Sequence, residues 1–230
     1  MNIWLTLCFC VLVVAYLLGS IPTGYLTAKL LKGIDIREFG SGSTGATNVL
    51  RTLGKGPGGS VLFIDSLKGV VAILIARELF HFAAAQDLLP GTINVDIWLS
   101  SMIALTAFFA ILGHSKSIFL GFSGGKSVAT SIGILFAMNW QVALICVGVF
   151  GIAIAISRFV SLSSISGALA APVSMVILNQ PLPYIIFGVV GSLYVVWRHK
   201  SNIGRLIAGT ESKLGQKVDV DVEQTVNPAS

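Results

Sequence analysis

Small polar residues and glycines gather beside basic residues in two stretches of an otherwise apolar chain. The first stretch, FGSGSTGATNVLR (residues 39–51), ends in Arg51, and the second, GHSKSIFLGFSGGKSVAT (residues 113–130), contains Lys126. Glycine lets backbone N–H groups approach a ligand closely, and the N–H groups at the start of a helix attract anions. With arginine and lysine beside them, such loops are typical of phosphate-binding sites.

Two further polar segments complete the set, SRFVSLSS (residues 157–164) and WRHKSNIGRLIAGTE (residues 197–211). Small residues also allow helices to pack tightly and chains to turn, and for one loop alone this structural explanation is as good as a binding site. Two such loops with basic neighbours favour an anion site. Its positive charge is expected from Arg51, from Lys126 and from either Arg198 or Arg205.

The composition indicates what must position these loops. Apolar residues make up 54% of the 230 residues and charged residues only 11%, which excludes an ordinary soluble domain. A membrane crossing needs about 20 apolar residues in a helix. We therefore predict an all-α integral membrane protein with one domain at residues 1–211 and a polar, disordered, dispensable tail at residues 212–230.

The apolar runs predict seven transmembrane helices. Three runs span about residues 3–31, 57–82 and 97–113, and the first should kink near Pro22. The uncharged run 127–157 is long for one crossing and short for two, and the run 159–197 is broken at NQPLP (residues 179–183). Basic residues flank the first loop, the third connection and the C-terminal end. The positive-inside rule places all three in the cytoplasm, so the run 127–157 should turn near Trp140, with the N-terminus outside and the C-terminus inside.

Asp65 and Lys68 lie three residues apart in the second apolar run, on one face of the expected helix. Because isolated charges in a membrane are costly, both side chains should face the bundle and pair with each other. The pair is either a structural ion pair or a support for the site, and the sequence favours neither.

Two known kinds of site are excluded by spacing. The segment GFSGGKS has the end of a nucleotide-binding P-loop, but Leu120 stands where the first glycine of that motif belongs and no strand precedes it. Acyltransferases that use thioesters carry an aspartate five residues after a catalytic histidine. Here the corresponding residues after His81, His114 and His199 are Gln86, Phe119 and Gly204.

The two loops, the segment VVWRHKSNIGRLIAGTE and the sequence IDSLKG (residues 64–69) together resemble the bacterial acyl phosphate:glycerol-3-phosphate acyltransferases. The resemblance covers residues 19 to about 211. It implies seven helices with a cytoplasmic active site in the bacterial inner membrane, which agrees with the topology expected from charge. It also implies transfer of an acyl group from acyl phosphate to the 1-hydroxyl of glycerol-3-phosphate, giving lysophosphatidic acid and inorganic phosphate. No coenzyme A, acyl carrier protein, metal or other cofactor is implied.

The resemblance assigns the site residue by residue. The residues expected to bind glycerol-3-phosphate are Arg51, Lys126, Ser164, His199 and Asn202. Those expected to hold the acyl phosphate are Ser41 and its surroundings, Gly40, Gly42, Ser43, Gly45, Thr47 and Asn48, and Gly124 and Gly125 are expected to add backbone contacts to substrate. Ser41 and His199 are the expected catalytic residues. The proton of the hydroxyl passes to His199 or to a phosphate oxygen of the donor, and the second route is favoured, with His199 positioning the substrate.

The chain departs from the family pattern at three places. Ser43 stands where the family usually has asparagine, Ser127 where it has glycine, and SKSI follows Gly113 and His114 where a proline-containing stretch is usual. Ser43 keeps a hydrogen-bonding group. Ser127 is the less comfortable change if the backbone there has positive φ. These departures are expected to alter local geometry and not the assignment.

The expected partners are the two substrates, membrane lipid and a soluble enzyme that makes acyl phosphate; no nucleic acid is expected. A transporter for a phosphorylated metabolite is the alternative of a different class. Transporter sites lie near the midplane of the membrane and usually come with inverted repeats. Only a faint echo links SGSTGAT with SGGKSVAT, and all four polar segments fall at one face, which favours the enzyme.

Overall fold

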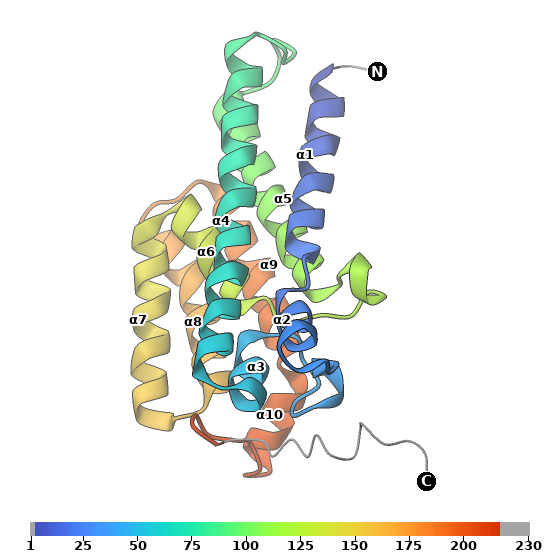
Figure 1. Cartoon of the computed structure of the whole chain (residues 1–230). Coiled ribbons are helices and arrows are strands. Elements are labelled where there is room, and N and C mark those ends of the chain that lie inside the picture. Colours follow the sequence, from blue (N-terminus) through green and yellow to red (C-terminus); the bar gives the residue numbers. More distant parts are fainter. Residues whose placement is uncertain (1–2, 217–230) are drawn as a thin grey trace.

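The protein is built of α-helices (Figure 1). The computed structural model describes residues 3–216, and this part of the chain contains no β-strand. Its elements are α1 (Ile3–Ser20), α2 (Thr23–Lys32), η1 (Ile36–Glu38), α3 (Ala46–Leu53), α4 (Lys55–Ala85), α5 (Val95–Ser115), η2 (Ile118–Leu120), α6 (Val128–Met138), α7 (Trp140–Ser157), α8 (Val160–Ile177), α9 (Leu182–Arg198) and α10 (Lys200–Ile207), where η marks a 3-10 helix.

Five helical segments of the described chain are long and apolar enough to cross a membrane. They are α1 continued into α2 (Ile3–Lys32), α4, α5, α7 and α8. A sixth is reached if α9 and α10, which bend by 58° at His199, form one span; α6 is apolar but has only 11 residues. The protein is thus an all-helical membrane protein with five or six clear spans, and the predicted count of seven stays a prediction.

The helix breaks fall where the sequence predicts them. Pro22, which has no N–H to donate, separates α1 from α2. The run 127–157 turns at Asn139, whose Oδ1 accepts hydrogen bonds of 3.0 Å from the backbone N–H groups of Gln141 and Val142 and so caps α7. The prediction of two short helices that meet beside Trp140 is confirmed.

Small residues bring the helices into backbone contact. A Cβ added to Gly133 of α6 would lie 1.9 Å from the carbonyl oxygen of Ser66 in α4, and one added to Gly19 of α1 would lie 2.2 Å from that of Ala110 in α5. Only glycine permits such an approach. Large apolar side chains fill the centre of the bundle, and among them are Ile73, Ile111, Ile134, Met175 and Phe187.

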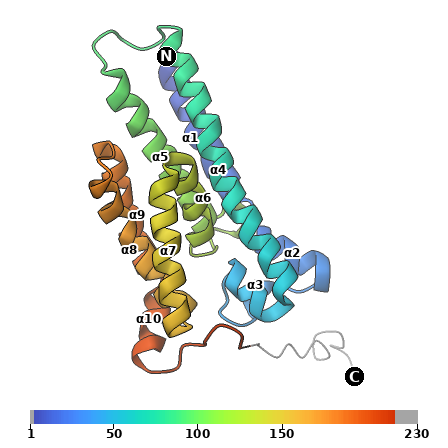
Figure 2. The ribbon, with the colours of Figure 1, turned by 90° about the vertical axis from the view of Figure 1, so that its left-hand side faces the viewer.

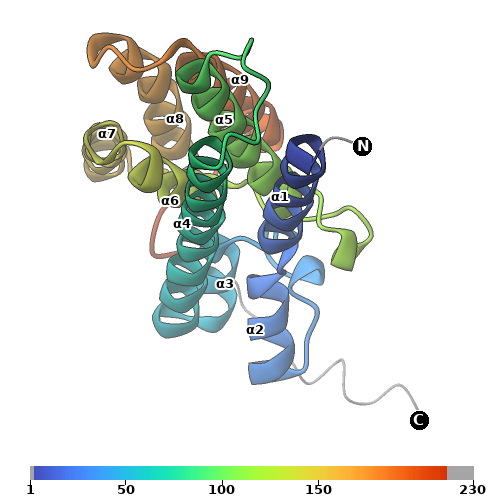
Figure 3. The same ribbon diagram turned by 90° about the horizontal axis from the view of Figure 1, so that it is seen from above.

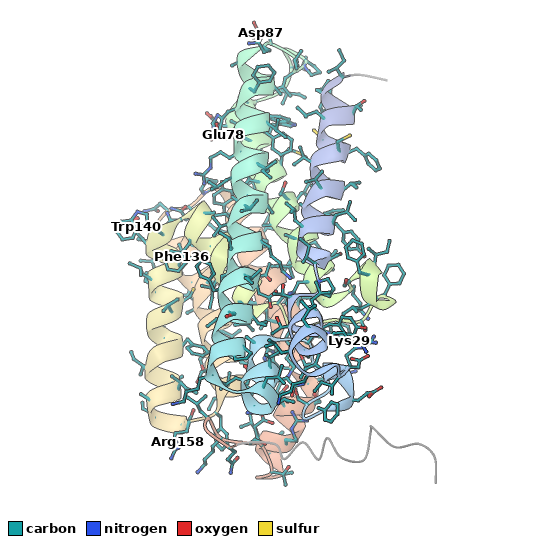
Figure 4. The ribbon with its side chains drawn as sticks, in the orientation of Figure 1. Lys29, Glu78, Asp87, Phe136, Trp140 and Arg158 are labelled. Atoms are coloured by element: carbon teal, nitrogen blue, oxygen red, sulfur yellow. The ribbon has the colours of Figure 1, made fainter. Side chains whose placement is uncertain are left out.

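One end of the bundle collects the polar segments. In Figures 1 and 2, the short helices α2, α3 and α10 lie at the same end. Figure 4 shows the basic residues Lys29 and Arg158 toward this end and the acidic residue Asp87 at the opposite end of α4. Seen from above, α7 and α8 lie on the side of the bundle away from α1 (Figure 3).

The segment after α10 returns to the bundle. The carbonyl oxygen of Ser212 accepts a hydrogen bond of 3.0 Å from Nη2 of Arg51, and the N–H of Leu214 donates one of 2.8 Å to the carbonyl of Arg158. These contacts hold the first residues of the predicted tail against α3 and the connection between α7 and α8. Residues 217–230, the rest of that tail, lie outside the described residues.

Candidate active site

A cavity of about 380 Å³ opens between the polar loops and the halves of α4, α6, α7 and α8 that lie toward the polar end of the bundle. Ten of the residues predicted from the sequence line it. They are Ser41, Ser43, Gly45, Thr47, Asn48, Arg51, Lys126, Ser164, His199 and Asn202. The cavity therefore draws together segments that are widely separated along the chain, as the sequence analysis requires of a single site.

Four helices begin around this cavity without a side-chain cap. The N-cap positions of α3, α6, α8 and α10 are Gly45, Ser127, Phe159 and His199, and none of these side chains accepts a hydrogen bond from its helix. The side chains of Asn94 and Asn139 cap α5 and α7, whereas α2, α4 and α9 also begin without a side-chain cap. Uncapped helix starts present free N–H groups and the positive end of the helix dipole. The arrangement suits a ligand that carries negative charge.

Asn48 organises the first loop. Its Oδ1 accepts a hydrogen bond of 2.9 Å from the N–H of Ser41, and its Nδ2 lies 3.1, 3.0 and 2.9 Å from the carbonyl oxygens of Ile36, Phe39 and Ser43. The buried amide is thus occupied within the protein and shapes the loop from inside. Asn48 also lines the cavity, so its predicted contact with substrate stays a prediction beside this support of the loop that carries Ser41.

Lys126 belongs to a chain of hydrogen bonds. Its Nζ donates to Oδ1 of Asn202 at 2.5 Å, Nδ2 of Asn202 donates to Oε1 of Glu211 at 2.7 Å, and Nε of Arg205 donates to Oε2 of Glu211 at 2.7 Å. Burial, and then the positive charge of Arg205, lowers the pKa of Lys126 to about 8. Burial opposes ionisation of Glu211, but the hydrogen bonds from Asn202 and Arg205 outweigh it and lower the pKa of that carboxyl group.

The arginines of the site have different roles. Arg51 is half-buried at the cavity, and its Nη2 donates to the carbonyl of Ser212. Nη2 of Arg198 donates to the carbonyl oxygens of Gly124 and Gly125 at 3.1 and 2.9 Å, so this arginine fixes the second loop. Because Arg205 pairs with Glu211, Arg51 and Lys126 remain as the cations best placed for a substrate anion.

The tautomer of His199 follows from its hydrogen bond. Nδ1 of the buried ring lies 2.7 Å from the carbonyl oxygen of Val195, one turn earlier in α9. A carbonyl oxygen only accepts, so Nδ1 carries the proton, and Nε2 of the neutral ring has a free lone pair. His199 lines the cavity, where Nε2 can accept a hydrogen bond from a hydroxyl group.

The other wall of the cavity is apolar. Its lining side chains come from α4, α6 and α7 and include Leu62, Val128, Ile132, Val147 and Phe150. A smaller cavity of about 40 Å³ shares Val128, Ile132, Phe150 and Ser164 with the first and continues toward Cys146 and Gly167. A site with cations at one end and an apolar groove at the other suits an amphipathic ligand with an anionic head.

Comparison with known proteins agrees with this geometry. The family model described as glycerol-3-phosphate acyltransferase matches residues 9–209. The chain belongs to the glycerol-3-phosphate acyltransferase family. The glycerol-3-phosphate acyltransferase of Trichormus variabilis is 65% identical over 98% of this chain and 100% of its own length, and that of Acaryochloris marina is 52% identical over the same shares.

Two crystal structures of glycerol-3-phosphate acyltransferase resemble the fold. Both are described as PlsY (YgiH), an integral membrane glycerol 3-phosphate acyltransferase, one in a glycerol 3-phosphate form and one in a lysophosphatidic acid form. The first has a TM-score of 0.80 and 37% identity over 90% of this chain and 96% of the other; the second has a TM-score of 0.76 over 91% and 96%.

Four glycines predicted to contact substrate lie outside the cavity lining of this glycerol-3-phosphate acyltransferase: Gly40, Gly42, Gly124 and Gly125. Gly40 and Gly42 have φ of 58° and 66°, values that allow the loop to turn. The contact with substrate predicted for the four glycines stays a prediction.

Ser127 adopts the strained backbone that its departure from the family pattern suggests, with φ of 65°. Its hydroxyl donates to the carbonyl of Ile111 at 3.0 Å and lies 2.8 Å from Oγ of Ser115. These bonds hold the second loop to the end of α5 and offset the strain.

Three ionisable residues that are not among the predicted binding or catalytic residues also line the cavity. They are Glu211, Asp65 and His114. Glu211 stands nine residues after Asn202 in the last polar segment, a signal that could have found it. The pairing of Asp65 with Lys68 is confirmed at 2.8 Å.

Proposed function

We propose that this glycerol-3-phosphate acyltransferase takes its acyl group from acyl phosphate and transfers it to the 1-hydroxyl of glycerol-3-phosphate. The products are lysophosphatidic acid and inorganic phosphate. The observation that carries the proposal is the cavity itself, which combines two cations, uncapped helix starts and an apolar groove. No metal or other cofactor takes part.

Glycerol-3-phosphate binds at the cationic end. Its phosphate lies between Arg51 and Lys126, and the guanidinium of Arg51 exchanges the Ser212 carbonyl for phosphate oxygens. Asn202, which touches Lys126, and Ser164, whose hydroxyl donates to the Val160 carbonyl at 2.8 Å, complete the polar wall. A phosphate is the natural counterion for a half-buried cluster with this excess of positive charge.

The acyl phosphate lies against the first loop. The hydroxyl of Ser41 and the backbone N–H groups at the uncapped start of α3 bind its phosphate, while the N–H of Ser41 stays bonded to Asn48. Its acyl chain follows the apolar wall toward Phe150 and Cys146. The membrane supplies this substrate from the lipid side, after a soluble enzyme has made it.

The transfer needs no acyl-enzyme intermediate, because acyl phosphate is already an activated mixed anhydride. The 1-hydroxyl oxygen attacks the acyl carbon, a C–O bond forms, and the bond from that carbon to the phosphate oxygen breaks with its electron pair on the phosphate. The phosphate that departs from the dianionic donor leaves as a strongly basic trianion, takes the hydroxyl proton and becomes hydrogen phosphate. His199 accepts a hydrogen bond from the hydroxyl at Nε2 and aligns it for attack.

The site faces the cytoplasm of a bacterium, and the chain crosses the inner membrane seven times with its N-terminus outside. The basic end in Figure 4 supports this orientation. Single cysteines at Gln86 and Ser212 should then react with a membrane-impermeant thiol reagent from opposite sides. Reaction of both from the cytoplasm would contradict the seven-helix count.

A comparison of donors tests the reaction. Purified protein in lipid is given glycerol-3-phosphate with either acyl phosphate or acyl coenzyme A, and lysophosphatidic acid is measured by mass spectrometry. Product from acyl phosphate alone supports the proposal, and product from the thioester alone overturns it. Intact donor in both cases, with uptake of glycerol-3-phosphate into vesicles, would support the alternative of a transporter.

A further inference from the structure

A cluster of three ionisable side chains is buried beside the cavity, and the reaction proposed above does not use it. Oδ1 of Asp65 lies 2.8 Å from Nζ of Lys68 and 3.6 Å from Nδ1 of His114. The three side chains are only 2–6% exposed. Nζ of Lys68 also donates to the carbonyl of Ile21 at the break between α1 and α2. Buried charges in a membrane bundle are costly, so such a cluster calls for a function.

His114 belongs to this cluster and also packs against the turn formed by Gly124 and Gly125. Its Nδ1 faces Asp65, while its Nε2 faces the backbone of Gly125, where an added Cβ would lie only 2.1 Å from that nitrogen. The carbonyl of His114 accepts a hydrogen bond of 3.2 Å from the N–H of Gly125, and a Cβ on Gly124 would lie 2.2 Å from the same oxygen. The two glycines are therefore packed directly around His114.

The same turn is held from its other side. Arg198 donates to the carbonyl oxygens of Gly124 and Gly125, so the turn is held between an arginine and a histidine. Lys126 follows directly, and its Nζ reaches Asn202 across the cavity. The His114 ring thus packs against the turn that directly precedes Lys126.

We propose that Asp65 and His114 are positioning residues for Lys126. Asp65 fixes the His114 ring, the ring supports the Gly124–Gly125 turn, and the turn aims Lys126 at the substrate phosphate; Lys68 balances the charge of Asp65. This inference rests on the proposed role of Lys126 in binding glycerol-3-phosphate. It explains why a buried carboxylate and imidazole line the cavity without belonging to the polar network of Asn202 and Glu211.

The test is the dissociation constant of glycerol-3-phosphate, measured by calorimetry on protein in lipid nanodiscs. His114→Gln should weaken binding about tenfold, within the range found for coupled neighbours. The same substitution made in Lys126→Ala protein should change the constant less than about twofold, because the lysine through which it acts is absent. The KM for acyl phosphate should stay within about twofold of the wild-type value.

Thr106→Val is the matched control. Thr106 is fully buried in α5, the helix that carries His114, and its hydroxyl donates to the Met102 carbonyl at 2.8 Å, away from the loop. It should leave the constant unchanged. If Thr106→Val weakens binding as much as His114→Gln does, the effect is general loosening of α5 and the inference is wrong.

Two further outcomes would overturn it. One is unchanged binding in His114→Gln, and the other is equal weakening with and without Lys126. If His114→Gln does not fold, the paired change Asp65→Asn with Lys68→Gln, which removes both charges together, should give the same tenfold weakening; failure of both variants to fold would assign the cluster to packing alone. Wild-type protein that binds glycerol-3-phosphate but leaves acyl phosphate intact would refute the proposed donor and not this inference.

Discussion

Nζ of Lys126 donates a 2.5 Å hydrogen bond to Oδ1 of Asn202, 76 residues further along the chain. The contact joins the loop after α5 to α10 and places the ammonium group among Arg51, Arg198 and Arg205. Within residues 3–216, Glu211 is the only negatively charged group among those that influence this lysine. The site is thus prepared for an anion before any substrate arrives.

The charge of Lys126 predicts how binding depends on pH. Its pKa is lowered to about 8, so the ammonium is charged below that pH and neutral above it. Affinity for glycerol-3-phosphate should be complete below about pH 8 and should fall roughly ten- to a hundredfold as the pH rises past it, the value of one charge-assisted hydrogen bond. Calorimetric titrations from about pH 7 upward measure this, since the substrate phosphate is already a dianion there.

Lys126→Arg is the control for that titration. Arginine stays charged through the whole range, so the variant should bind less tightly than the wild type but with little change above about pH 8. A fall in affinity of the same size in Lys126→Arg would assign the pH dependence to another group.

The backbone conformation of Ser127 predicts that a glycine variant at this position is more stable than an alanine variant. Its left-handed backbone costs about 1–3 kcal/mol for a residue other than glycine, and its hydroxyl contacts Ser115 and Ile111. Ser127→Gly loses those hydrogen bonds but also the strain, so its Tm should stay near the wild-type value. Ser127→Ala loses the bonds and keeps the strain, so its Tm should be clearly lower. An alanine variant as stable as the glycine variant would contradict the strain assigned to this position.

The close packing at Gly133 predicts that a methyl group added there destabilises the protein. Gly133→Ala places a Cβ against the Ser66 carbonyl and must separate α6 from α4, which we expect to destabilise the protein by about 1–3 kcal/mol. Gly148→Ala on α7 is the matched control, because in the described part of the chain no atom beyond the neighbouring backbone of α7 lies within 4 Å of the added Cβ. Thermal unfolding in detergent compares the two. A similar loss of Tm in both would mean that α4 and α6 are not in backbone contact.

The sequence predicts the helices and the grouping of the site well, for physical reasons. Pro22 and Asn139 interrupt long apolar runs, and such breaks are local signals. The polar loops are easy to recognise because the segments that cross the membrane are almost entirely apolar. Arg51 and Lys126 are therefore predictable from the sequence as site residues, and both line the cavity.

The roles of individual polar groups could not be predicted in the same way. Gly125 lies in a segment whose composition is typical of a phosphate-binding loop. It nevertheless packs on His114, and its carbonyl oxygen accepts a hydrogen bond from Arg198. The contact of Asp65 with His114 joins α4 to α5 and leaves no mark in local spacing. Arg51 is held by a backbone carbonyl at Ser212, a group that every residue type carries. These relationships depend on tertiary packing.

The central claim is that the phosphate of glycerol-3-phosphate binds between Arg51 and Lys126, and Arg51 tests it most directly. The measurement is kcat/KM for glycerol-3-phosphate, with acyl phosphate as donor, in Arg51→Ala protein that unfolds at the wild-type temperature. We predict a fall of roughly ten- to a hundredfold or more, because a charge-assisted hydrogen bond in a half-buried site contributes about 1.5–3 kcal/mol. Arg51→Lys should not restore the full value, since an ammonium group lacks the two-pronged geometry of guanidinium. A value near that of the wild type in Arg51→Ala would mean that the first loop only packs helices and that the substrate binds elsewhere.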